Sequence, residues 1–105
     1  MLTQAGAQNN LGNILRQRYP PDFVSAVMFF SLAAEQNNSE AIYNLGCCYG
    51  NGQGAPQDWI RACELFQQSC DLGYPLGPGM LFQILSVVLP AESRGVQVQI
   101  VGLVG

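Results

Sequence analysis

The chain of 105 residues repeats itself with a period of about three dozen residues. Segment 22–37 aligns with segment 58–73 at an offset of 36, with Asp, Ala and Phe at matching places. Upstream, segment 7–12 aligns with segment 41–46 at an offset of 34, so the first unit is two residues shorter than the second. A repeat of this length is one supersecondary unit that cannot bury its apolar face alone, so neighbouring units must stack.

Each unit is predicted to form two amphipathic helices. In the second unit, packing residues recur at i, i+4, i+7 and i+8 from Ala41 and at i, i+4 and i+7 from Ala62. This spacing gives each helix one face to bury. Small residues on these faces, such as Gly46, indicate close helix approach, with Phe30 and Phe66 filling the remaining volume.

Residues at the expected helix ends agree with these boundaries. Asp22 and Asp58 precede the second helix of each unit, where a side-chain oxygen can accept hydrogen bonds from the first free amides. Ser39 is the expected cap of the helix that opens the second unit. Asn37 and Gly73 stand at equivalent positions, where a residue in the left-handed conformation would end each second helix.

A glycine-rich stretch joins the two helices of the second unit. Gly50, Gly52 and Gly54 superficially resemble a phosphate-binding loop, but they follow a helix instead of a strand and no lysine follows them. Three glycines that supply positive φ angles to a tight turn explain the stretch.

Composition excludes much catalytic and binding chemistry. The chain contains no histidine, and its four basic residues are all arginine. A histidine base, a histidine metal ligand and a lysine Schiff base are therefore excluded. With a net charge of −3 and four scattered arginines, the chain is not expected to bind nucleic acid.

The four cysteines, at positions 47, 48, 63 and 70, have no zinc-type spacing, so we predict no metal site and no cofactor. They are interpreted as small buried residues with free thiols. A disulfide stays open as an alternative, since antiparallel pairing could bring Cys48 opposite Cys63.

The second unit resembles the Sel1-like repeat family, relatives of the tetratricopeptide repeat. The resemblance rests on Ala41-x-x-x-Leu45-Gly46-x-x-Tyr49-x-x-Gly52-x-Gly54-x-x-x-Asp58-x-x-x-Ala62, followed by Leu65-Phe66 and Gly73. The first unit matches with a shortened loop that lacks the glycines. The resemblance implies an all-α fold, a right-handed α-solenoid of antiparallel helix pairs that serves as a docking surface for other proteins.

The sequence from Cys70 to Gly73 is also similar to a cysteine-rich subgroup of this family, whose disulfides join the second helix to the first. The partner position falls at Ala41 or Ile42, so the subgroup's pairing is not carried over.

We divide the chain into a repeat array over residues 1–89 and a degenerate tail over residues 90–105. The array comprises about two and a half repeats, over 5–38, 39–74 and 75–89. The partial third unit is expected to form one helix from Gly77 to Leu89, ending before Pro90. Residues 96–104 alternate like a strand that finds no partner in a solenoid, so we expect an irregular, poorly ordered apolar tail.

The leading functional prediction is a scaffold, without enzymatic activity, that binds a partner protein or peptide on a concave face lined by the first helices. The candidate contacts lie off the packing stripe of those helices. Simple exposure to solvent explains the polar character of these positions equally well. They are Asn9, Asn13, Glu40, Tyr43, Asn44 and Cys47, with Asn10 on the same side.

Two alternatives stay open. Cysteine-rich relatives suggest β-lactam binding or hydrolysis, although a thiolate at Cys47 would have no histidine or lysine to activate it. The second alternative is that the chain is a fragment of a longer array and has no independent function. The most apolar segment, 80–89, is too short to span a bilayer, and no secretory signal is apparent, so the default expectation is a cytoplasmic location.

Overall fold

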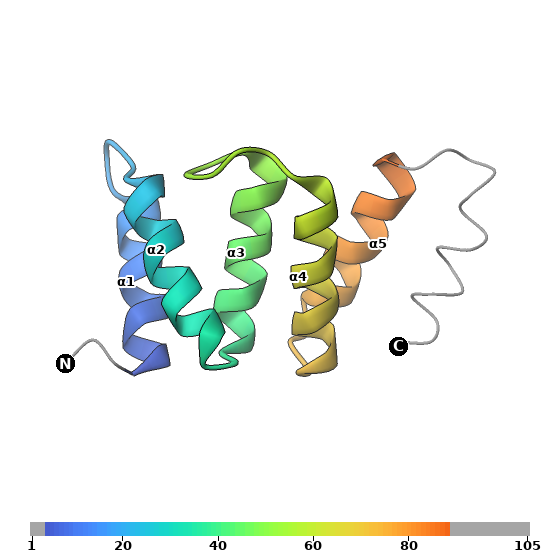
Figure 1. Cartoon of the computed structure of the whole chain (residues 1–105), viewed down its shortest axis with the longest axis horizontal. Coiled ribbons are helices and arrows are strands. Elements are labelled where there is room, and N and C mark those ends of the chain that lie inside the picture. The colour runs from blue at the N-terminus through green and yellow to red at the C-terminus, as the bar shows by residue number, and fades with distance from the viewer. Residues whose placement is uncertain (1–3, 89–105) are drawn as a thin grey trace.

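The computed structural model describes residues 4–88, which form five α-helices and no strand (Figure 1). The helices are α1 (Ala5–Gln17), α2 (Phe23–Glu35), α3 (Ser39–Asn51), α4 (Trp59–Asp71) and α5 (Gly77–Val88). Helix α1 packs on α2, α2 on α3, α3 on α4, and α4 on α5, so the helices stand in sequence along one axis (Figure 1). The predicted all-α stack is confirmed. The expectations for the tail at 90–105 lie outside the described residues.

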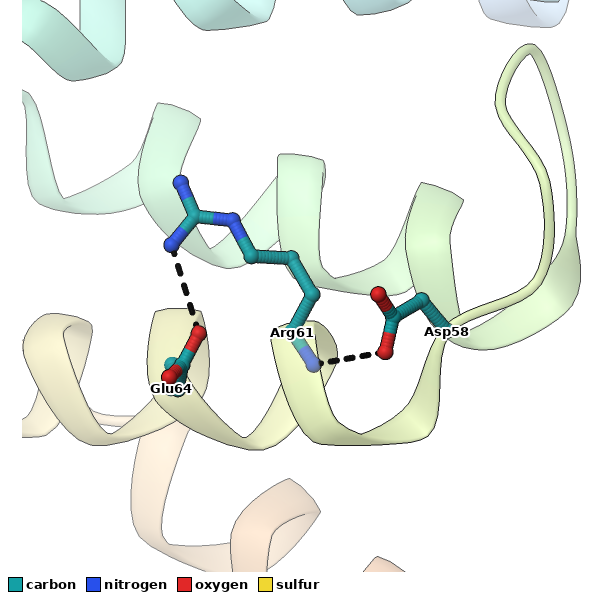
Figure 2. Close-up of polar contacts among 3 residues, drawn as sticks. All are labelled: Asp58, Arg61 and Glu64. Carbon is teal, nitrogen blue, oxygen red and sulfur yellow. Dashed lines mark hydrogen bonds and ion pairs between the residues drawn. The ribbon is translucent and has the colours of Figure 1, made fainter.

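Aspartate side chains cap the second helix of each unit, as predicted. Asp22 Oδ1 accepts a hydrogen bond from the backbone N–H of Ser25 at 3.0 Å. Asp58 Oδ1 accepts one from the backbone N–H of Arg61, also at 3.0 Å (Figure 2). Figure 2 also shows the Arg61 guanidinium turned toward Glu64, with the nitrogen and oxygen 3.5 Å apart. The caps satisfy amides that have no partner within the helix.

The predicted cap of α3 is wrong by one residue. Asn38 Oδ1 accepts a hydrogen bond from the backbone N–H of Ala41 at 2.9 Å, and Ser39 is already helical. Asparagine and serine are equally good caps, so the sequence did not separate the two. The predicted left-handed residues are confirmed, because Asn37 has φ +62° and Gly73 has φ +87°.

The loop between α3 and α4, within the second unit, packs against the first unit. Gly52 and Gly54 have positive φ angles, as predicted, but Gly50 is still part of α3, so that prediction is wrong. The loop extends back toward the start of α2 (Figure 1). A Cβ added at Gly54 would lie 2.2 Å from the carbonyl oxygen of Phe23. Only glycine therefore allows this approach.

One glycine and one phenylalanine form the internal contact of each helix pair. A Cβ at Gly12 would lie 2.6 Å from Phe30 Cε1, and a Cβ at Gly46 would lie 2.9 Å from Phe66 Cε1. Both phenylalanine side chains are fully buried. The predicted close approach of a small residue and a large ring is therefore present in both units.

The buried residues form two apolar clusters. The first lies between α2, α3 and α4, and its members are Ala26, Phe30, Ile42, Leu45, Cys48 and Leu65. The second lies between α4 and α5, and its members are Ala62, Phe66, Leu81 and Ile84. Tyr49 packs against both, so the core continues from one unit to the next.

All four cysteines are free. The open alternative of a bond between Cys48 and Cys63 is not realised. Cys48 is a fully packed member of the first cluster, and Cys63 packs at the edge of the second. Free cysteine behaves here as a small apolar residue.

Candidate binding groove on the first helices

A groove of about 440 Å³ lies between α1 and α3 and reaches the loop before α5. We call it the amide groove. Its lining residues are Asn13, Arg16 and Gln17 from α1, Glu40, Tyr43, Asn44 and Cys47 from α3, and Tyr74 and Leu76 from the loop. Five of the six predicted contacts therefore line one groove. The sixth, Asn9, is buried and hydrogen-bonded to Asn44, whereas Asn10 is exposed and is not part of the lining.

Helical spacing explains why these residues meet. On α3, Glu40, Tyr43, Asn44 and Cys47 are spaced i, i+3, i+4 and i+7. On α1, residues 9, 13 and 16 have the spacing i, i+4 and i+7. Such residues share one helix face, so two first helices in successive units present their polar faces to each other.

Three asparagines connect α1 to α3 in a hydrogen-bonded chain that we call the amide ladder. Asn9 Nδ2 donates to Glu40 Oε2. Asn44 Nδ2 donates to Asn9 Oδ1 at 3.0 Å and to Asn13 Oδ1 at 3.5 Å. Arg16 Nη2 also donates to Asn13 Oδ1, at 2.7 Å. The ladder therefore has a carboxylate at one end and a guanidinium at the other.

Two of the predicted contact residues are not solvated. Asn9 is 3% exposed and Asn44 is 5% exposed, although both were expected off the packing stripe. A polar side chain can be buried when its partners are provided, and the ladder provides them across two helices. Asn9 and Asn44 therefore have a structural role, because their hydrogen bond connects the first unit to the second.

Tyr43 connects the groove to the core. Its ring centroid lies 5.4 Å from that of Phe66 and 5.0 Å from that of Tyr74. Burial, together with the neighbouring Cys47, raises the pKa of Tyr43 to about 12. The hydroxyl is therefore protonated at neutral pH and can exchange hydrogen bonds with a ligand.

An apolar pocket of about 250 Å³ adjoins the amide groove. Its lining comprises Cys47, Gly50 and Asn51 from α3, Trp59 and Phe66 from α4, and Met80, Gln83 and Ile84 from α5. Cys47 belongs to both linings, so the two cavities meet at this residue. This pocket was not predicted from the sequence. The sequence feature that indicates the pocket is Met80, 36 residues after Asn44. It places an apolar side chain at a position where the two preceding units have an asparagine.

Arg16 lines the amide groove but was not among the predicted contact residues. Its guanidinium carbon lies 5.6 Å from the centroid of the Phe30 ring. Among residues 4–88, the only ion pair within 4.0 Å joins Arg61 to Glu64, so no carboxylate neutralises Arg16. The sequence feature that could have identified Arg16 is its position one turn after Asn13 on the same face of the helix.

The thiols in and near the groove are not activated. Burial raises the pKa of Cys47, although the hydrogen bond with Tyr43 and the charge of Arg16 act in the opposite direction. Burial raises the pKa of Cys48 to about 11. Both thiols are protonated at neutral pH, and the thiolate is the reactive form. Within the described residues no three His, Cys, Asp or Glu side chains cluster as a metal site would require.

The repeat pattern and the helix pairs match a known family model. The model of the Sel1 repeat matches residues 5–38 and 39–74. The chain belongs to the Sel1 repeat family. Sel1 repeat proteins are generally scaffolds for protein interactions without enzymatic activity of their own.

Two solved structures have the same arrangement of helices. A Sel1 repeat protein from Oxalobacter formigenes superimposes with a TM-score of 0.73 over 81% of this chain, at 22% identity. A protective antigen with an SLR fold, present in uropathogenic Escherichia coli strains, superimposes with a TM-score of 0.73 over 89% of this chain, at 26% identity. The matches cover 35% and 19% of those chains, respectively. The Sel1 fold is thus shared with longer proteins.

A rat protein described as DAP3-binding cell death enhancer 1 is similar in sequence. It is 33% identical over 67 residues, which is 64% of this chain and 13% of the rat protein. The chain therefore spans a small part of this relative.

No helix within residues 4–88 combines the length and the apolar character needed to cross a bilayer.

Proposed function

We propose that this Sel1 repeat chain is a scaffold whose protein partner lies on the face of the first helices, across the amide groove and the apolar pocket. The observation that carries the proposal is that the two cavities meet at Cys47. Protein interfaces combine a desolvated apolar centre with polar groups around it, and this face offers both within reach of one short segment.

The comparison with the rat relative supports a protein as the partner class. That relative is described as DAP3-binding. Its description concerns a chain of which the aligned region is only 13%, so the identity of its partner is not carried over.

Binding without catalysis agrees with the chemistry of the groove. The alternative of β-lactam hydrolysis needs an activated nucleophile, and burial keeps the Cys47 thiol protonated. No histidine or lysine occurs in the chain to act as a base. No observation in the structure favours that alternative.

The proposal is tested by selecting peptides from a random phage-displayed library and measuring their affinity for two matched variants. Cys47→Phe places a ring where the two cavities meet. Ile60→Phe adds the same ring on the outer face of α4, where Ile60 is 76% exposed. Selected peptides should bind the wild type and Ile60→Phe alike, and bind Cys47→Phe at least about tenfold more weakly. Equal binding to both variants, with unchanged helicity, contradicts the proposal.

A further inference from the structure

The two ends of the amide ladder fix the direction of every hydrogen bond within it. A carboxylate only accepts hydrogen bonds, so Asn9 must present its Nδ2 to Glu40 and its Oδ1 to Asn44. A guanidinium only donates, so Asn13 must present its Oδ1 to Arg16. Both neighbours of Asn44 thus offer an acceptor, and Asn44 must donate to both.

This polarity leaves one buried acceptor without a donor. Asn44 uses its Nδ2 in the ladder, and no N–H or O–H of residues 4–88 donates to its Oδ1. The side chain is 95% buried and lines the amide groove. Buried polar atoms in proteins are nearly always hydrogen-bonded, so this oxygen is a place where a ligand's N–H group fits.

The positive charge of the groove is also available. Arg16 has five N–H donors, and one hydrogen bond to Asn13 occupies part of them. Arg16 lies in the last turn of α1 and Glu40 in the first turn of α3. Because α1 and α3 run in the same direction (Figure 1), these two charges lie at opposite ends of the groove. Glu40 is engaged by Asn9, so Arg16 provides the open charge.

Arg16 and the apolar pocket lie at the same end of α3. Gly50 and Asn51, in its last turn, line that pocket, with Met80 of α5 beyond them. Neighbouring helices are separated by on the order of 10 Å, and an extended chain advances roughly 3.3 Å per residue. A segment that crosses α3 therefore separates its Arg16 contact from its pocket contact by about three to five residues.

We propose that the groove binds an extended segment of a partner protein that carries an acidic side chain for Arg16 and a large apolar side chain for the pocket, and that donates a main-chain N–H to Asn44 Oδ1. This inference rests on the proposed function and specifies its ligand. The charge is complementary to Arg16, and the apolar side chain is complementary to Trp59, Phe66 and Met80. The main-chain N–H completes the ladder.

The test uses a phage-displayed library whose peptides are fused at their C-terminus, so that every carboxylate is a side chain. Enriched peptides should carry Asp or Glu about three to five residues from a Leu, Met, Phe or Trp. Synthetic forms of the best peptide then compare Glu with Gln and with Lys by fluorescence polarisation. The Glu form should bind the wild type at least about tenfold more tightly than the Lys form, with a smaller difference at high salt.

Two arginine variants locate the charge effect. Arg16→Met should remove the preference for Glu, whereas Arg18→Met should keep it, because Arg18 is exposed and is not part of the groove lining. Arg16→Lys keeps the charge and should keep the preference even if the methionine variant unfolds. An N-methyl scan of the peptide should find one main-chain position where methylation weakens binding by about tenfold.

Three outcomes overturn the inference. Groove-dependent peptides without an acidic residue would refute the ligand while leaving the scaffold function in place. A preference for Glu that persists in Arg16→Met would place the acid elsewhere. A library that yields no peptide sensitive to Cys47→Phe would refute the scaffold proposal as well.

Discussion

The first helix pair, α1–α2, and the second, α3–α4, share their internal contacts and differ in the surfaces that they present. In both, a glycine of the first helix receives a phenylalanine of the second, as Gly12 receives Phe30 and Gly46 receives Phe66. In both, an aspartate caps the second helix. These shared contacts lie inside the pair, where close packing leaves little freedom.

The outer faces of α2 and α4 follow no such rule. Three exposed residues of α2 are apolar, whereas two of the three equivalent residues on α4 are polar; the pairs are Val24 and Ile60, Met28 and Glu64, and Leu32 and Gln68. The groove side differs as well, because an amide at Asn44 becomes a thioether at Met80 in α5. The shared positions therefore build the scaffold, and the proposed binding face includes positions at which the first helices of the units differ.

The largest predicted effect tests whether the two internal contacts are equivalent. Phe30→Ala and Phe66→Ala should each lower the free energy of unfolding by about 3–5 kcal/mol, because each removes a fully buried ring and leaves a cavity. Urea denaturation followed by circular dichroism measures both. Values that differ by more than about 2 kcal/mol would break the equivalence of the two pairs.

The next effect tests the glycine-containing loop between α3 and α4, whose glycines have no counterpart in the shorter loop of the first unit. Gly54→Ala should lower the free energy of unfolding by about 2–3 kcal/mol, because the new methyl group would meet the Phe23 carbonyl and φ is +80°. Gly73→Ala is the matched control, with φ +87° and no atom of residues 4–88 beyond its chain neighbours within 4 Å of the new Cβ, and should cost about 1 kcal/mol. Equal losses would mean that the loop does not hold the units together.

A smaller effect tests the amide ladder between the units. Asn44→Ala and Asn9→Ala should each lower the free energy of unfolding by about 1–2 kcal/mol, because each leaves buried partners without a hydrogen bond. The double variant should lose less than the sum, since the two residues share one bond. Asn10→Ala, on the exposed side of α1, should change the value by less than about 0.5 kcal/mol. Additive losses at Asn9 and Asn44 would contradict the ladder.

The smallest effect tests the freedom of the outer faces. Met28→Glu gives α2 the residue that α4 has at the equivalent position, Glu64. Met28 is 52% exposed, so the free energy of unfolding should change by less than about 0.5 kcal/mol. Thermal unfolding is the measurement, and a loss above about 1 kcal/mol would show that this face is packed against something.

Much of the scaffold could be predicted because its determinants are local or periodic. The caps at Asp22 and Asp58 and the left-handed residues Asn37 and Gly73 follow from one stretch of sequence each. The local sequence does not decide between Asn38 and Ser39 as the cap of α3, because both side chains suit the position.

The groove was predicted only in part. Helical spacing placed Tyr43, Asn44 and Cys47 on one face, and the structure gathers them in one groove. Spacing alone does not say what approaches that face. Asn44 can be buried because it hydrogen-bonds to Asn9, which is 35 residues away in the chain. Without knowledge of that partner, a polar side chain such as Asn44 is predicted to be exposed. Arg16 was not predicted, although its position one turn after Asn13 on the same helix face is a local signal.

Amide chemical-shift mapping is the most direct measurement of where a partner lies. Titration with a peptide enriched in the display selection should shift the side-chain amide of Asn44, the indole of Trp59 and the methyl group of Met80. Signals of Val24, Met28 and Ile60 on the outer faces should stay in place. Shifts confined to the outer faces, with the signals of Asn44 and Trp59 unchanged, would contradict a binding face on the first helices.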